Sequence, residues 1–113
     1  MADDGEQVVP WLLTGLQRVR RWQLGHSSGF GSRHITLGRM ADGRWLAEDS
    51  DTARGSHAYR SRERAERAVA ELMWEGEWTE VPAVLDANGR ADGWIRRGNT
   101  WMRDRSEDAP EQG

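Results

Sequence analysis

The sequence predicts a small α+β domain, in which an antiparallel sheet of about five strands packs against one amphipathic helix and a further N-terminal helix. Two patterns predict it: apolar residues recur with helical spacing between 62 and 75, and short alternating segments lie between turn residues. A length of 113 residues suits one domain. We expect that domain over residues 8–103, between disordered acidic tails at 1–7 and 104–113.

The composition limits the kind of core that the chain can build. Leu, Ile, Val and Phe make up only 17 of the 113 residues, which is low for a folded domain. Seven tryptophans and a net charge of −3 favour folding nevertheless, because each buried indole removes roughly 150–250 Å² from water. All 16 basic residues are arginine, which indicates a GC-rich genome such as those of actinobacteria and the phages and plasmids they carry.

Cysteine-dependent sites and a membrane location are disfavoured, because the chain lacks the residues and segments that they need. It has no cysteine, so disulfides and thiolate metal sites are excluded. The acidic start and the absence of a long apolar run predict a cytoplasmic protein without a membrane partner.

Charge is distributed unevenly along the chain. Between Leu16 and Arg44 there are six arginines and one acid, whereas between Glu71 and Asp92 there are six acids and one arginine. This bipolar pattern favours a protein partner or self-association over non-specific binding to DNA.

The N-terminal helix is expected over residues 9–22, with Pro10 in the first turn, where its missing N–H costs little. Its apolar face would consist of Val9, Leu12, Leu13, Leu16 and Val19. Its last turn would carry Arg18, Arg20 and Arg21. These arginines either complement the helix dipole or contact phosphate.

Residues 34–40 and 44–48 alternate as two strands around Ala41-Asp42-Gly43. A three-residue loop with Gly43 left-handed places Ile35, Leu37, Trp45 and Ala47 on one face, and buries no charge there. The alternative two-residue turn would group Arg39 and Arg44 with the apolar residues. We expect the first register, with Trp45 buried and Leu46 more exposed.

The best-patterned element is the helix expected over residues 62–75, after a short strand at 57–60. Ser61 is a suitable N-cap and Gly76 a suitable residue for leaving the helix. The apolar face consists of Ala65, Ala68, Val69, Leu72 and Met73. This face should pack across the sheet.

Two segments around this helix carry a resemblance. Gly43-Arg44-Trp45 and Tyr59-Arg60-Ser61 with Ala65 resemble the three-strand-plus-helix arm-binding domains of phage integrases, and equally some small bacterial domains of unknown function. The match covers about 45 residues. The integrase resemblance implies a basic sheet that enters DNA, but this sheet also carries Glu48 and Asp49.

The C-terminal part should return to β structure. Residues 78–85 are expected to form one strand interrupted by Pro82, which confines the strand to a sheet edge or a bulge. Residues 94–97 and 100–103 are expected to form a hairpin around Gly98-Asn99. A two-residue turn opposes Trp94 to Arg103, Ile95 to Met102, Arg96 to Trp101 and Arg97 to Thr100. Ile95 and Met102 should then face inward, while Trp94, Arg96, Trp101 and Arg103 share the solvent face, where guanidinium groups stack on indoles. The four form either a structural ladder or a recognition surface.

No catalytic, metal or nucleotide-binding motif is present. The three histidines are far apart, and Asp86, Asn88 and Asp92 miss the spacing of a calcium loop. We expect a non-enzymatic accessory or regulatory protein, without cofactor or metal, that binds a protein partner through Trp94, Arg96, Trp101 and Arg103. The alternative is a nucleic-acid-binding module that uses Arg18, Arg20, Arg21, Arg39 and Arg44.

Overall fold

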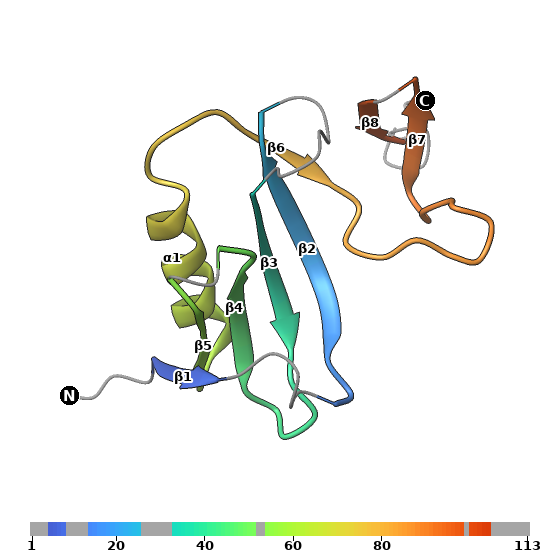
Figure 1. Ribbon diagram of the computed structural model, residues 1–113. Coiled ribbons are helices and arrows are strands. Elements are labelled where there is room, and N and C mark those ends of the chain that lie inside the picture. Colours follow the sequence, from blue (N-terminus) through green and yellow to red (C-terminus); the bar gives the residue numbers. More distant parts are fainter. Residues whose placement is uncertain (1–4, 9–13, 26–32, 52–53, 99, 105–113) are drawn as a thin grey trace, which may run out of the picture.

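The computed structural model describes residues 5–8, 14–25, 33–51, 54–98 and 100–104. They form a six-stranded antiparallel sheet of order β1-β5-β4-β3-β2-β6, one helix α1 against one face of the sheet, and a separate two-stranded sheet, β7-β8, beyond β6 (Figure 1). The elements are β1 (Glu6–Val8), β2 (Gln17–Leu24), β3 (His34–Arg39), β4 (Trp45–Asp49), β5 (Ser56–Tyr59), α1 (Arg62–Leu72), β6 (Trp78–Val81), β7 (Trp94–Arg97) and β8 (Thr100–Arg103).

The register between β3 and β4 is the one predicted from the three-residue loop. Leu37 pairs with Ala47. The Met40 amide donates to the Arg44 carbonyl at 2.8 Å, and Gly43 closes the loop at φ 94°, a left-handed conformation that glycine adopts without a steric penalty.

Helix α1 packs over β3, β4 and β5, as its pattern predicts. The Ser61 Oγ accepts a hydrogen bond from the Arg64 amide at 3.2 Å, which caps the first turn. Buried Ala65 and Val69 contact a cluster of Ile35, Leu37 and Ala47, with Trp22, Trp45, Tyr59, Ala68, Leu72, Met73 and Trp78 packed around it. The helix ends at Leu72, earlier than expected.

A second apolar cluster lies on the sheet face opposite α1, hereafter the helix-free face. Leu46 is fully buried there with Met40 and Ala58, and Val8 and Leu16 pack against them. The expectation that Leu46 is more exposed than Trp45 is therefore wrong, since Trp45 is only half-buried. Leu16, just before β2, packs closely against Gly38 on this face. A Cβ atom added to Gly38 would lie only 2.9 Å from the Leu16 Cδ1, so a larger residue would disturb this contact.

The predicted N-terminal helix is also wrong where the structure describes it. Residues 17–24 form strand β2, which pairs with β3 on one side and β6 on the other, and residues 9–13 lie outside the described ranges. Val19, assigned to the apolar helix face, is at a bulge and partly exposed. Two ladders of backbone hydrogen bonds and the packing of Trp22 on the core outweigh the helical preference of this arginine-rich segment.

The described residues contain eight strands, more than the five expected, and six of them share one sheet. Strand β1 extends the ordered part of the chain to Glu6, inside the stretch assigned to the N-terminal tail. Strand β6 ends directly before Pro82 and occupies a sheet edge, as the proline predicts.

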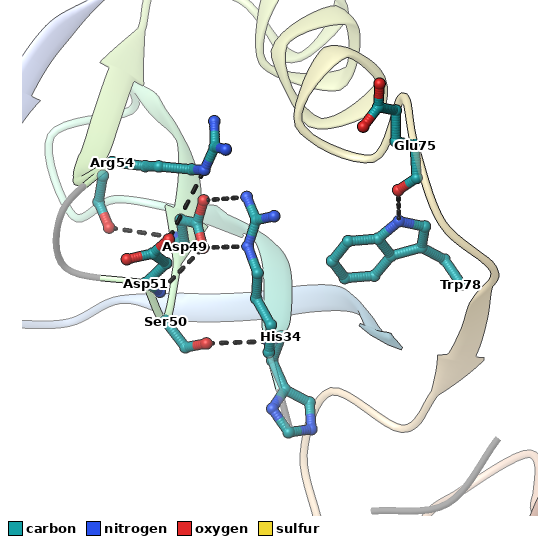
Figure 2. A network of polar contacts seen from close by, with 9 residues as sticks. His34, Asp49, Ser50, Asp51, Arg54, Glu75 and Trp78 are labelled. Atoms are coloured by element: carbon teal, nitrogen blue, oxygen red, sulfur yellow. Dashed lines mark hydrogen bonds and ion pairs between the residues drawn. The ribbon is translucent and has the colours of Figure 1, made fainter. Parts of the chain in front are cut away.

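A polar network joins the ends of β3 and β4 near β6 (Figure 2). The Arg33 guanidinium donates to both carboxylate oxygens of Asp49, at 3.0 and 2.7 Å, and lies over the Trp78 ring at 5.5 Å from its centroid. The Asp49 side chain is fully buried, and its Oδ1 also accepts from the Asp51 amide at 2.9 Å. Both carboxylate oxygens of Asp49 thus accept a hydrogen bond.

Candidate functional site

The hairpin formed by β7 and β8 has the predicted register. Trp94 is opposite Arg103, and Arg96 is opposite Trp101. The Arg103 guanidinium lies 4.4 Å from the Trp94 ring centroid, and the Arg96 guanidinium lies 5.7 Å from that of Trp101. Strand alternation places all four side chains on one face, which we call the Trp/Arg face.

The orientation of this hairpin is opposite to the expected one. Ile95 and Met102, predicted to face inward, are 41% and 48% exposed, whereas Trp94 and Trp101 are half-buried against the rest of the chain. A two-stranded sheet has no core of its own, so it buries whichever face offers more apolar area to a neighbour. Two indoles offer more than an isoleucine and a methionine.

One acidic residue connects the Trp/Arg face to the main sheet. The Glu80 carboxylate on β6 accepts from Arg20 at 2.9 and 3.0 Å, and from Arg103 at 3.0 Å. Burial alone raises the pKa of Glu80, but the two guanidinium groups outweigh it and hold the pKa below its ordinary value. Sequence analysis did not identify Glu80, because the contact depends on which strand lies beside the hairpin.

A cavity of about 320 Å³ lies between β2, β3, β6 and the hairpin. We call it the arginine cavity. It is lined by Arg21, Gln23, His34, Thr79, Val81, Pro82, Ala83, Leu85, Arg96, Thr100 and Trp101. None of these described lining residues is acidic, although 19 of the 113 residues in the chain are. The cavity therefore combines positive charge, an indole and an apolar wall.

Arg21 differs from its neighbours on β2. Its Nε atom is buried and has no hydrogen-bond partner within the described residues. Arg20, the preceding residue, points to the other face of the sheet and pairs with Glu80, and Arg18 pairs with Glu48 at 3.0 and 3.1 Å. A buried donor without an acceptor carries a desolvation cost that a ligand could remove.

The five arginines proposed for nucleic-acid binding do not form one surface. Arg18 and Arg21 belong to the helix-free face, and Arg20 and Arg39 to the face that carries α1, where Arg39 lies 6.0 Å from the Trp45 ring centroid. Arg44 pairs with Asp42 and with Glu6 of β1. Three of the five are therefore neutralised by carboxylates.

Among the described residues, the most exposed large apolar side chain lies elsewhere. Trp74, just after α1, is 83% exposed and follows the acidic Glu71. Neither helical periodicity nor strand alternation singles it out, because it lies in the turn between two elements.

Comparisons with protein-family models, with curated protein sequences and with solved structures found no match to this chain. The described residues contain no helix that is both long enough and apolar enough to cross a membrane. Nor do they bring three or more acidic or histidine side chains together in a way that could hold a metal ion.

Proposed function

We propose that this chain is a small non-enzymatic accessory or regulatory protein, and that it binds a protein partner through the Trp/Arg face of its C-terminal hairpin and the arginine cavity beside it. The observation that carries the proposal is the composition of this surface. Tryptophan and arginine are among the residues most enriched at binding hot spots. The surface places two of each on one face of the hairpin, and Arg96 and Trp101 of this face line the cavity.

The attachment of the hairpin supports the same function. The described contacts that hold it include the ion pair between Arg103 and Glu80, and its outer face leaves Ile95 and Met102 partly exposed. A two-stranded element that has no core of its own, and that is held beside the sheet in part by an ion pair, can adjust to a partner.

The charge arrangement favours a protein over a nucleic acid. Arg18, Arg20 and Arg44 are already paired, and the helix-free face, which would have to enter a groove of DNA, is partly covered by Leu16 and Val8. Glu48 and Glu80 are the carboxylates that pair with Arg18 and Arg20, so these pairs offer no net positive charge to a polyanion.

Replacing one indole tests the proposal. We expect Trp101→Ala to leave the melting temperature nearly unchanged, because the core clusters do not include it, and to weaken partner binding by about 2 kcal/mol, as removal of a hot-spot residue does. The measurements are a thermal melt, and titration of the variant against a partner first isolated with the wild-type protein from nuclease-treated host extract.

The matched control is Trp74→Ala, which removes an exposed indole outside the hairpin. It should leave partner binding intact. Equal affinity of the wild type and Trp101→Ala would rule out the Trp/Arg face, and loss of the partner on nuclease treatment would favour the nucleic-acid alternative.

A further inference from the structure

The arginine cavity has two guanidinium groups, but none of its described lining residues carries a carboxylate. Arg21 contributes a guanidinium whose buried Nε has no acceptor in the described part of the chain. Within the described residues, Arg96 on the hairpin side of the cavity donates only to the Gly98 carbonyl, at 3.0 Å, and its guanidinium lies over the Trp101 ring. Two guanidinium groups therefore line a concave site whose described lining residues include no carboxylate.

Elsewhere in this chain, a comparable pairing of arginine and tryptophan also includes the carboxylate. Arg33 combines a stacked indole with a buried carboxylate that accepts two parallel hydrogen bonds. Arginine binds oxyanions in this forked geometry, and the bonds are stronger where water is excluded. The arginine cavity has the guanidinium and the indole, and none of its described lining residues supplies the anion.

The walls of the cavity restrict which anion fits. Val81, Pro82, Ala83 and Leu85 form an apolar side next to the polar one. A volume of about 320 Å³ is at the small end of ligand sites and has room for a single residue rather than a long segment. A free phosphate would leave the apolar wall without a contact.

We propose that the arginine cavity binds the C-terminal carboxylate of a partner protein, with Arg21 and Arg96 as the anion-binding residues and the apolar wall and Trp101 as the site of the last side chain. This proposal rests on the proposed function and adds to it the group that is recognised. Capture of a chain end by convergent donors is a known mode of peptide recognition.

The test uses the full chain and small probes. N-acetylleucine carries a free terminal carboxylate beside an apolar side chain, and N-acetylleucinamide is its neutral match. In NMR titrations at constant ionic strength, we expect N-acetylleucine to shift the Arg21 Nε–H and the Trp101 indole N–H signals saturably, and the amide to leave them in place. Arg21→Gln and Arg96→Gln should each weaken binding roughly tenfold or more, as expected for loss of a charged hydrogen bond. Arg60→Gln, at an exposed arginine outside the cavity, should bind like the wild type.

The following outcomes would overturn the assignment of a C-terminal carboxylate to the arginine cavity. Equal shifts from the amide would show that the carboxylate is not recognised, and equal weakening in Arg60→Gln would show a non-specific charge effect. Tighter binding of inorganic phosphate, or of glutamic acid blocked as its N-acetyl α-amide, would replace the chain end by a phosphate or by an acidic side chain. A melt of each variant shows that it is folded. If N-acetylleucine binds but no partner depends on Trp101, the cavity assignment stands and the proposed function fails. If a partner depends on Trp101 but N-acetylleucine does not bind, the proposed function stands and the cavity assignment fails.

Discussion

Arg33 and Arg21 lie on or beside neighbouring strands of one sheet, yet they are in opposite states. Arg33 donates twice to the fully buried Asp49 and lies over Trp78, whereas the buried Nε of Arg21 has no partner among the described residues. The first site is complete within the chain, and the second has the cation, a neighbouring indole and no anion. This difference is the reason why we assign a structural role to the Arg33 site and propose a binding role for the Arg21 site.

Removal of the anion from the complete site should have the largest effect. We expect Asp49→Ala to lower the free energy of unfolding by about 3 kcal/mol, because it leaves a partly buried cation without its partner. Chemical denaturation measures the change. The control is Glu66→Ala on α1, where both side chains of the Arg62–Glu66 pair are about half exposed, and where the loss should not exceed about 0.5 kcal/mol. Equal losses in Asp49→Ala and Glu66→Ala would show that the buried Arg33–Asp49 pair stabilises the fold no more than an exposed ion pair does.

An intermediate effect is expected at Glu80, which attaches the hairpin to the sheet. Its pKa is lower in the folded chain than its ordinary value of 4.5, so its contribution to stability is fully present above that value and is lost as the pH falls through the folded-state pKa. Tryptophan fluorescence should change in this acidic range as Arg20 and Arg103 lose their acceptor. Glu80→Gln should remove that step and cost about 1 kcal/mol or less at neutral pH. A wild-type acid titration identical to that of Glu80→Gln would show that this contact does not hold the hairpin.

The smallest effect on stability is expected at the incomplete site. Arg21→Gln should change the free energy of unfolding by no more than about 0.5 kcal/mol, because it removes a buried Nε donor that has no acceptor among the described residues. Denaturation of this variant beside Asp49→Ala measures the contrast directly. A loss at Arg21 as large as that at Asp49 would mean that Arg21 has a structural partner, and would remove the reason to look for a ligand.

Local chemistry allowed several features to be predicted without the structure. The amphipathic helix with its Ser61 cap, the register set by the left-handed Gly43 and the four pairs of the last hairpin all depend on residues close together in the chain. Turn geometry and side-chain periodicity are local properties, so they can be predicted from the amino-acid sequence alone.

Tertiary structure decided what local patterns leave open. Residues 17–24 became a strand because β3 and β6 offered hydrogen bonds along both edges, and Leu46 became buried because Val8 and Leu16 cover the helix-free face. The hairpin turned its indoles inward because the edge of the sheet lay beside it. Arg20 pairs with Glu80 because successive side chains point to opposite faces of the sheet and Glu80 lies on the face that Arg20 shares. The Nε of Arg21, on the other face, has no hydrogen-bond partner among the described residues. These outcomes depend on which distant surface is nearby, and that is a property of the whole fold.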